Sequence, residues 1–435
     1  MTKQKRVLVL GAYGLIGTEV AHALRERGHE VTGLVRSKRK AARLLPGVPA
    51  IEADIARLES ADEWRDLVAG FDAVVNASGA LQDGLRDHVA AVQDTAIRAL
   101  ISACEKAGVS GFVQISAPGA EEGASTEFMR SKARADAFLR GSGLNWTILK
   151  PGLVIVRTAY GGTALIRMLA AIPWLQPLAL PDARLQVVSA VEIGEAVADC
   201  LEGGAHARRD YDLVSEEAFR LAEIVAQHRR WLGFAPARAQ FTVPGFFGSL
   251  AARLGDLAGW FGWRPALRTT ALKVLEKDVI GDPAPWASAT GRRVKPLESI
   301  LASMPAASQE RLYARVQLLL PVLILTLSIF FISSGLIGLW RLDAAIANLS
   351  AVVGDRLSRL MVIGGAVLDM ALGAAILLRP LARGAAFGMV LLSAAYLVLG
   401  TWLTPSLWGD PLGPLVKIPP VMVLALAAAM LSGER

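Results

Sequence analysis

Short apolar runs and longer amphipathic segments alternate along the first half of the chain. The apolar runs have the length of strands and lie at 6–10, 30–35, 50–55, 71–79, 111–117 and 145–152. A strand that is apolar throughout is typical of a parallel sheet, because helices cover both of its faces. Patterns of helical period separate these runs, among them 85–108 and 127–141. The alternation predicts an α/β domain with a doubly wound parallel sheet.

The last third of the chain has a different pattern, in which apolar residues form long stretches with few charges. Hydrophobic residues make up 53% of the whole sequence, and the excess is concentrated at 315–340, 359–378, 383–404 and 412–431. Each stretch reaches the roughly 20 residues that a helix needs to cross a bilayer. The pattern predicts an α-helical bundle of four transmembrane spans, with both ends of the bundle on the same side of the membrane.

Three regions are therefore expected, at 1–235, 236–310 and 311–435. In the middle region, 241–264 is rich in aromatic residues but also carries charges, which make a membrane span unfavourable. Such a segment is typical of a helix that lies in the membrane interface, and a helix packed on the soluble domain is the alternative. The segment 280–296 contains proline and glycine at intervals and is predicted to be a connector with little regular structure.

Composition excludes several functions. The net charge of +7 could indicate nucleic acid binding, but basic residues that flank membrane spans produce the same charge. No nucleic-acid-binding motif is present, so the lipid bilayer is the expected partner and nucleic acid is not. The two cysteines and five histidines lack the spacing of a disulfide framework or a metal site. We therefore expect no metal.

Orientation in the membrane depends more on the first domain than on the charges of the loops. The apolar run near the N-terminus is too short for a signal peptide, so the first domain is expected in the cytoplasm. Arginines lie in the loops on both sides of the predicted bundle, which weakens the positive-inside signal. We expect a multi-pass protein of the inner (plasma) membrane.

The first apolar run leads directly into the sequence GAYGLIG, and a helical pattern follows. This order favours a dinucleotide site, because glycines let the backbone approach a pyrophosphate at the helix N-terminus. A turn that is rich in glycine by chance is the alternative. Tyr13 is expected to pack on phosphate or adenine. The expected cofactor contacts in the turn are Gly11, Tyr13, Gly14, Leu15, Ile16 and Gly17.

The residue after the second strand distinguishes two cofactors. An acidic residue there binds the ribose hydroxyls of NAD, whereas an arginine suits the 2′-phosphate of NADP. Arg36, followed by Ser37, therefore favours NADP over NAD, and a solvated basic loop is the alternative. Asp54, at the end of the third strand, is placed to meet the adenine amine. The loop after the fourth strand is also expected beside the cofactor, through Ala77, Ser78 and Gly79.

Taken together, these motifs resemble the atypical short-chain dehydrogenases, in particular their NmrA-like and complex I 39-kDa-subunit-like branches. The resemblance covers about residues 5–235 and implies an NAD(P)-binding Rossmann domain. It rests on the glycine pattern, Asp54, NASG at 76–79, Ser116, Lys132 and GLNWTILKPGLV at 143–154. The four apolar stretches, with their glycine-rich second and third members, resemble the DoxX-like membrane family, named for a subunit of thiosulfate:quinone oxidoreductase.

The resemblance also implies catalytic roles. In catalytic members a lysine binds the nicotinamide ribose and lowers the pKa of a tyrosine, which transfers a proton while a serine orients the carbonyl. Ser116 and Lys132 match this pattern, and Pro151 falls among the implied cofactor contacts. Phe128 occupies the position of the tyrosine and has no proton to give, a loss that typically costs about 10²–10⁴ in rate. Tyr160 is a candidate replacement, or else a loop residue near the pocket mouth.

Asp369 is an acidic residue well inside a predicted span, where such side chains are costly and usually functional. It could face a headgroup cavity, a quinone ring or Lys417, or belong to a buried structural pair.

Two functions remain open from the sequence. The first is a membrane-bound, NADP-dependent oxidoreductase whose substrate is a hydrophobic quinone-like or lipid-like molecule. The second is an NADP-binding protein without turnover, which senses redox state or supports a membrane complex. The retained Ser116 and Lys132 favour the oxidoreductase, whereas Phe128 favours the protein without turnover.

Overall fold

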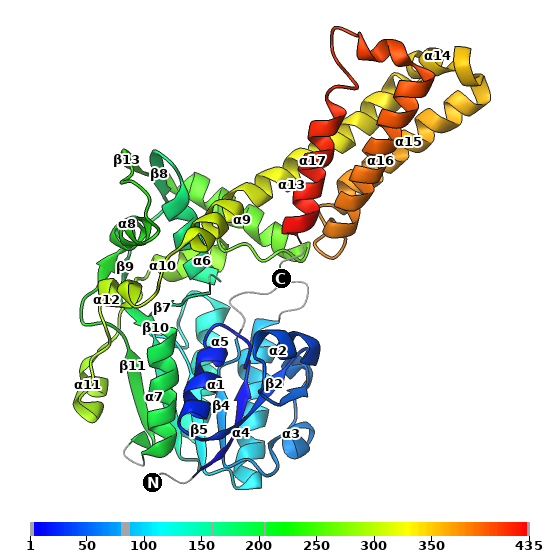
Figure 1. Ribbon diagram of the computed structural model, residues 1–435. Coiled ribbons are helices and arrows are strands. Elements are labelled where there is room, and N and C mark those ends of the chain that lie inside the picture. Colours follow the sequence, from blue (N-terminus) through cyan, green and yellow to red (C-terminus); the bar gives the residue numbers. More distant parts are fainter. Residues whose placement is uncertain (1–3, 80–87, 159–160, 204–205, 433–435) are drawn as a thin grey trace. The chain divides into compact units, whose positions relative to one another are not determined.

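The structure is a computed structural model that describes residues 4–79, 88–158, 161–203 and 206–432 (Figure 1). Contacts divide the chain into two compact units. The first comprises Met1–Leu257 and Pro265–Arg311, and the second comprises Ala258–Arg264 and Leu312–Arg435. We call them the nucleotide unit and the membrane unit. The three regions expected from the sequence remain a prediction.

A seven-stranded sheet forms the centre of the nucleotide unit, with the strand order β11-β6-β5-β4-β1-β2-β3. All of its neighbouring strands run parallel. The order reverses between β1 and β4, as in the doubly wound fold that the sequence predicts. The strands are β1 (Arg6–Leu10), β2 (Glu30–Val35), β3 (Ala50–Glu52), β4 (Ala73–Asn76), β5 (Gly111–Ile115), β6 (Trp146–Pro151) and β11 (Arg209–Leu213).

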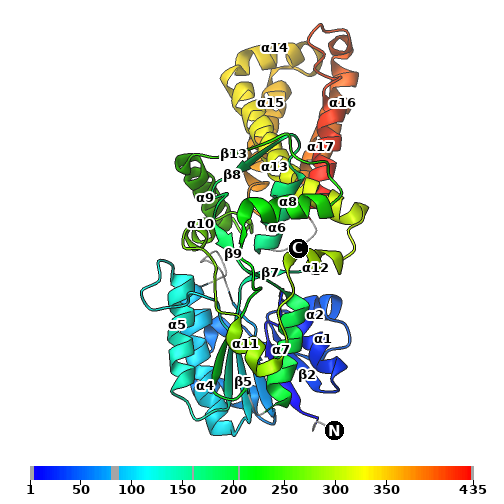
Figure 2. The same ribbon diagram turned by 90° about the vertical axis from the view of Figure 1, so that its left-hand side faces the viewer.

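Helices cover both faces of this sheet (Figure 2). One face carries α1 (Gly17–Glu26), α2 (Lys38–Leu44) and α7 (Ala190–Glu202). The other carries α3 (Ala61–Val68), α4 (Ala96–Ala107) and α5 (Glu127–Arg140). Strand β1 shows why the strands are apolar throughout. Successive side chains of a strand alternate between the two faces of the sheet, and both faces are buried here. Val7 and Val9 belong to the core on the α1 face, and Leu8 and Leu10 belong to the core on the α4 face.

The strand positions predicted from the sequence agree with the observed strands, and the differences in where elements begin and end have local causes. Strand β3 ends at Glu52, before the predicted end at 55, because the Asp54 side chain caps a 3-10 turn at Ile55–Arg57. The helix predicted at 85–108 is observed as a π-helical turn, η2 (Ala91–Thr95), followed by α4, and residues 85–87 lie outside the described residues.

Smaller elements complete the nucleotide unit. The segment at 280–296, predicted to have little regular structure, contains helix α11 (Ala284–Thr290), whose Trp286 is buried against the rings of Tyr211 and His206. The strands are β7 (Leu153–Ile155), β8 (Leu175–Leu178), β9 (Arg184–Leu185), β10 (Val187–Ser189), β12 (Phe219–Arg220) and β13 (Ala239–Thr242). The helices are α6 (Gly161–Ala171), α8 (Leu221–Trp231), α9 (Gly245–Trp260), α10 (Thr269–Leu275), α11 (Ala284–Thr290) and α12 (Leu297–Ala302).

The C-terminal region is helical, as predicted. Among the described residues, three helices are long and apolar enough to cross a membrane: α13 (Ser308–Trp340), α15 (Asp355–Ala375) and α16 (Ala382–Leu403). The fourth predicted span forms α17 (Ile418–Leu431), an apolar helix of 14 residues. At 1.5 Å per residue it is about 21 Å long, shorter than the roughly 30 Å of hydrocarbon in a bilayer. Helix α14 (Leu342–Val353) lies where the sequence predicted a loop.

Close helix packing in the membrane unit depends on glycine. A Cβ atom at Gly335 of α13 would lie 2.4 Å from the carbonyl oxygen of Ala366 in α15. A Cβ atom at Gly373 of α15 would lie 2.8 Å from Ile332 Cγ1. The Ser328 hydroxyl donates a hydrogen bond to the Gly373 carbonyl at 2.7 Å. Small residues and interhelical hydrogen bonds of this kind are typical of membrane helix pairs.

Gly194→Val should destabilise the nucleotide unit. A Cβ atom at Gly194 of α7 would lie 2.7 Å from the carbonyl oxygen of Glu19 in α1, so a valine must push these helices apart. Overpacking of this kind typically costs about 1–3 kcal/mol. The measurement is the thermal unfolding of the full-length protein in detergent. Gly123→Val is the control, because nothing lies within 4 Å of its Cβ position. Equal unfolding temperatures for the two variants would contradict the packing argument.

Candidate functional site

The glycine turn and the loop after β4 touch each other where the strand order reverses. Gly11 has a positive φ of 70°, and a Cβ atom there would lie 2.9 Å from the Ala77 carbonyl oxygen and 3.0 Å from Ser78 Cα. A Cβ atom at Gly17 would lie 2.2 Å from the Gly11 carbonyl oxygen, which also accepts a hydrogen bond from Gly14 N at 2.7 Å. A side chain at Gly11 or Gly17 would therefore break the turn.

Helix α1 starts directly from this turn. Its N-cap residue is Ile16, and no side chain caps its N-terminus. An uncapped N-terminus leaves N–H groups for an anion, as dinucleotide sites require for the pyrophosphate. Leu15 and Ile16 are half-buried in the turn. Tyr13 packs against the core on the α1 face. The residues present therefore fit a bound dinucleotide.

The ends of β2 and β3 present the residues predicted for the adenosine half. Arg36 follows β2 directly and is exposed. Ser37 is the N-cap of α2, where its hydroxyl accepts a hydrogen bond from Lys40 N at 3.4 Å. Asp54 accepts a hydrogen bond from Ala56 N at 3.3 Å, and its carboxylate lies 3.8 Å from the Arg57 guanidinium. Ser37 and Asp54 thus also shape the local backbone.

Ser116 is hydrogen-bonded to a residue that the sequence did not single out, and Lys132 is hydrogen-bonded to the backbone beside Ser116. The Ser116 hydroxyl, at the end of β5, donates a hydrogen bond to the carboxylate of Asp136 in α5. Lys132 donates from Nζ to the Ile115 carbonyl at 2.8 Å, and Nζ lies 5.6 Å from the centroid of the Phe128 ring. Phe128, Lys132 and Asp136 are spaced by four residues, so they lie along one side of the helix. The same spacing of four residues could have indicated Asp136 from the sequence alone.

Burial shifts the pKa values of both ionisable groups. Burial lowers the pKa of Lys132 to about 8, against the opposing effect of the Asp136 charge. Burial also raises the pKa of Asp136 to about 6, although the Ser116 hydrogen bond and the Lys132 charge act in the other direction. Within the described chain, Asp136 Oδ1 is buried without a hydrogen-bond partner. Perturbed groups of this kind cluster at functional sites.

The loop after β4 is held by polar residues that sequence reasoning also missed. Asn76 donates from Nδ2 to Gln114 Oε1 at 2.9 Å, and its Oδ1 accepts hydrogen bonds from Ser78 N at 3.1 Å and Ser78 Oγ at 2.5 Å. Gln93 lies in the π-helical turn η2, where its amide nitrogen is 3.5 Å from the Cβ position of Gly79. Turns of this type are frequent at functional sites.

The predicted contacts thus follow the carboxyl edge of the sheet. Pro151 ends β6 at that edge and is buried. Tyr160 lies outside the described residues, so its candidacy stays a prediction. Among the described residues, no group of three or more His, Cys, Asp or Glu side chains could hold a metal ion.

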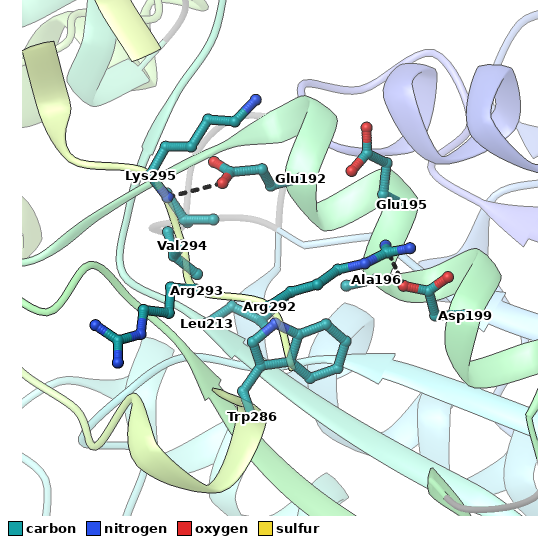
Figure 3. A pocket seen from close by; sticks show the side chains of 11 residues that line it. Glu192, Glu195, Ala196, Asp199, Leu213, Trp286, Arg292, Arg293, Val294 and Lys295 are labelled. Carbon is teal, nitrogen blue, oxygen red and sulfur yellow. Dashed lines mark hydrogen bonds and ion pairs between the residues drawn. The ribbon is translucent and has the colours of Figure 1, made fainter. Parts of the chain in front are cut away.

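A hollow of about 270 Å³ lies on another part of the nucleotide unit, between α7 and the segment after α11 (Figure 3). Two polar contacts join residues that line it. Arg292 lies 2.7 Å from Asp199, and Lys295 N donates to Glu192 Oε1 at 2.8 Å. None of the predicted site residues lines it. We interpret it as part of the contact by which the segment 280–296 packs on α7.

Asp369 joins helices of the membrane unit. Its Oδ2 accepts a hydrogen bond from Ser334 Oγ of α13 at 2.9 Å, and the side chain of Tyr396 in α16 is a second hydrogen-bonding partner. Among the described residues these are its side-chain partners. Of the alternatives that the sequence left open, the structure therefore shows the buried structural one, with hydrogen bonds that join three helices.

Both parts of the chain are similar to known protein families. Residues 11–165 match the family model described as NAD(P)H-binding, and residues 328–426 match the DoxX-like family. The UPF0659 protein YMR090W of Saccharomyces cerevisiae is 31% identical over 158 residues, which cover 34% of this chain and 69% of the yeast protein. The chain belongs to the NAD(P)H-binding, NmrA-like branch of the atypical short-chain dehydrogenases. Its C-terminal part is a DoxX-like domain, which makes it a membrane protein.

Other proteins are also similar to the nucleotide unit. The photosystem II assembly factor Ycf39 of Synechocystis sp. is 34% identical over 147 residues, which cover 33% of this chain and 44% of that protein. The structure of Citrobacter sp. triphenylmethane reductase complexed with NADP(H) superposes with a TM-score of 0.54 at 18% identity, over 69% of this chain and 100% of that chain. At this identity the likeness concerns the fold.

Lys132→Met should remove a pH dependence of stability. The pKa of Lys132 is about 8 in the folded protein, below its ordinary value of 10.5. Between these two values the unfolded chain binds more protons than the folded one, so this lysine makes the free energy of unfolding rise with pH. The measurement is thermal unfolding at several pH values in that interval.

Lys106→Met, a change of an exposed lysine in α4, is the matched control for this experiment. It should keep the wild-type slope of stability against pH. If Lys132→Met also kept that slope, Lys132 would not be the buried lysine described above.

Proposed function

We propose that this protein is a membrane-anchored NADP(H)-dependent oxidoreductase that delivers a hydride to a quinone-like or lipid-like acceptor. The observation that carries the proposal is the arrangement at Ser116, Phe128 and Lys132. The buried lysine of the dehydrogenase family is retained, yet neither neighbouring side chain has a proton free for a substrate carbonyl.

The hydrogen-bonding groups of Phe128 and Ser116 explain why neither side chain can protonate a substrate carbonyl. A phenyl ring has no donor, and a serine hydroxyl has one proton, which Ser116 gives to Asp136. A simple carbonyl needs a proton as it receives the hydride, and the loss of that acid typically costs about 10²–10⁴ in rate. A quinone tolerates the loss better, because the charge of its reduced form is delocalised over a ring and water can protonate it later. The arrangement therefore favours a conjugated acceptor.

The chain would hold the cofactor through residues at the carboxyl edge of the sheet. The glycine turn and the N-terminus of α1 would bind the pyrophosphate. Lys132, whose pKa of about 8 keeps it mostly protonated at neutral pH, would bind the nicotinamide ribose. The bound nicotinamide would supply the hydride. The balance is one hydride to the quinone and one proton from water, which oxidises one NADPH and yields one hydroquinone.

The DoxX-like domain supports a hydrophobic acceptor. Helices that cross the bilayer keep the enzyme where such molecules dissolve. NADPH is a cytoplasmic cofactor, so we place the nucleotide unit in the cytoplasm and the helices in the plasma membrane. A partner in a membrane complex is compatible with this arrangement.

A role without turnover is the second candidate. Phe128 supports it, since the family's usual proton donor is absent. The relative from Synechocystis sp. is named as an assembly factor, although this chain spans only 44% of it. In that case the protein would bind NADP(H) and report redox state to a membrane complex, or support its assembly.

Cofactor choice gives the first test. Arg36→Ala should weaken NADPH binding far more than NADH binding, because only NADPH carries the 2′-phosphate that an arginine at the end of β2 suits. Isothermal titration with both cofactors would measure the two losses. Arg39→Ala is the matched control, since Arg39 is also exposed but lies inside α2. Equal losses for both cofactors in Arg36→Ala would remove the 2′-phosphate assignment and favour NAD.

Turnover gives the second test. The purified full-length protein should oxidise NADPH with quinones as acceptors and reduce simple carbonyls poorly. Phe128→Tyr should leave quinone reduction nearly unchanged and create carbonyl reduction. The new hydroxyl would lie one helical turn from the Lys132 ammonium, which lowers a tyrosine pKa. Absorbance at the NADPH band measures both reactions.

Two other outcomes are informative in this assay. Bound NADPH without turnover on any quinone or lipid carbonyl would favour the second candidate. A wild-type protein that already reduces simple carbonyls well would show that the acid lies elsewhere, and Tyr160→Phe would be the next variant.

A further inference from the structure

Helix α9 presents its large apolar side chains outward and its smallest residues inward. Gly248, Ala252 and Gly255 are buried. The Cβ position of Gly248 is 3.2 Å from Ala179 Cβ, and that of Gly255 is 2.1 Å from the Leu267 carbonyl oxygen. The opposite side of the helix is exposed and carries Phe246, Phe247, Leu250, Leu254, Leu257 and Trp260. We call these six residues the α9 face.

This pattern is the reverse of that in a soluble amphipathic helix, whose large apolar residues face the core. Phe246 is 73% exposed and Trp260 is 61% exposed, whereas Ala252 is fully buried. At 100° per residue the buried and exposed sets point in opposite directions. A contiguous exposed apolar surface of this kind marks a contact with a protein or a membrane.

The chain itself indicates which contact this is. The segment Ala258–Arg264, which comprises the last three residues of α9 and the four that follow it, belongs to the membrane unit. Trp263 donates from Nε1 to the Leu377 carbonyl at 2.6 Å, and Arg379 N donates to the Phe261 carbonyl at 2.9 Å. Leu377 and Arg379 lie in the loop between α15 and α16, two of the helices that can span a bilayer.

A loop between two spans lies where the hydrocarbon ends, so the C-terminus of α9 is fixed at the membrane boundary. The Arg379 guanidinium stacks 5.3 Å from the centroid of the Trp263 ring, and tryptophan and arginine are both typical of that boundary. Arg253 is exposed within α9, and a long arginine side chain can reach lipid phosphates while its stem covers apolar surface. The paired strands β8 and β13, of which β13 directly precedes α9, carry exposed Leu175 and Phe241, and exposed Trp174 directly precedes β8.

We infer that the α9 face inserts into the interfacial layer of the same bilayer that the C-terminal helices span. In this arrangement the nucleotide unit is attached to the membrane twice, through the spans and through α9. The inference rests on the packing of α9 and does not depend on the chemistry proposed for Ser116 and Lys132.

Spin labels can test the position of this face in the full-length protein. A single cysteine would be introduced by Leu250→Cys in a background with Cys104→Ala and Cys200→Ala, and a nitroxide attached. The labelled protein would be placed in lipid nanodiscs. Leu44→Cys is the matched control, because Leu44 and Leu250 are 42% and 44% exposed and Leu44 lies at the end of α2.

The readout is the ratio of collision rates with oxygen, which concentrates in lipid, and with a water-soluble nickel chelate. We expect this ratio to be several-fold higher at position 250 than at position 44. Phe247→Cys and Leu254→Cys should behave like Leu250→Cys, which keeps the test valid if one variant fails to fold. Thermal unfolding would confirm that each labelled protein is folded.

Two results would overturn the inference. Equal ratios at positions 44 and 250, with mobile nitroxides at both, would place the α9 face in water. Low collision rates with both reagents at position 250, together with an immobilised nitroxide, would show that protein covers the face.

Discussion

Close approach of backbone to backbone at the end of β1 is the constraint on which the nucleotide unit depends. The carbonyl oxygen of Gly11 lies 2.2 Å from the Cβ position of Gly17, and the Cβ position of Gly11 lies 2.9 Å from the carbonyl oxygen of Ala77. These contacts set the start of α1 beside the loop after β4. They produce an uncapped helix N-terminus where the strand order reverses, which is where doubly wound proteins bind their ligands.

Burial then determines what the chain can do with a bound nucleotide. Lys132 and Asp136 are charged groups inside the protein, and each moderates the shift that burial imposes on the pKa of the other. Ser116 gives its proton to Asp136, and Phe128 covers the Lys132 ammonium with a ring instead of a hydroxyl. Under the proposed function, this combination retains a cofactor site while it limits the acceptors to those that obtain their proton from water.

The same physics of small residues recurs where the chain meets the membrane. Glycines let α13 and α15 approach closely, and glycines and alanine let α9 pack on the nucleotide unit. In both places the large apolar side chains are left pointing away from the protein. In water such surfaces are costly, whereas in lipid they are not, so the packing is consistent with a bilayer around the spans and against α9.

The sequence by itself determined the features that depend on local patterns. Apolar runs located the strands, the glycines located the turn, and long apolar stretches located three helices able to span a membrane. Asp136 and the outward face of α9 required the tertiary structure, as did the shortness of α17. Ser116 and Asp136 are 20 residues apart, and Gly248 meets a residue that is distant in sequence. Periodicity shows which side of an element is apolar, but only packing decides whether that side meets protein, water or lipid.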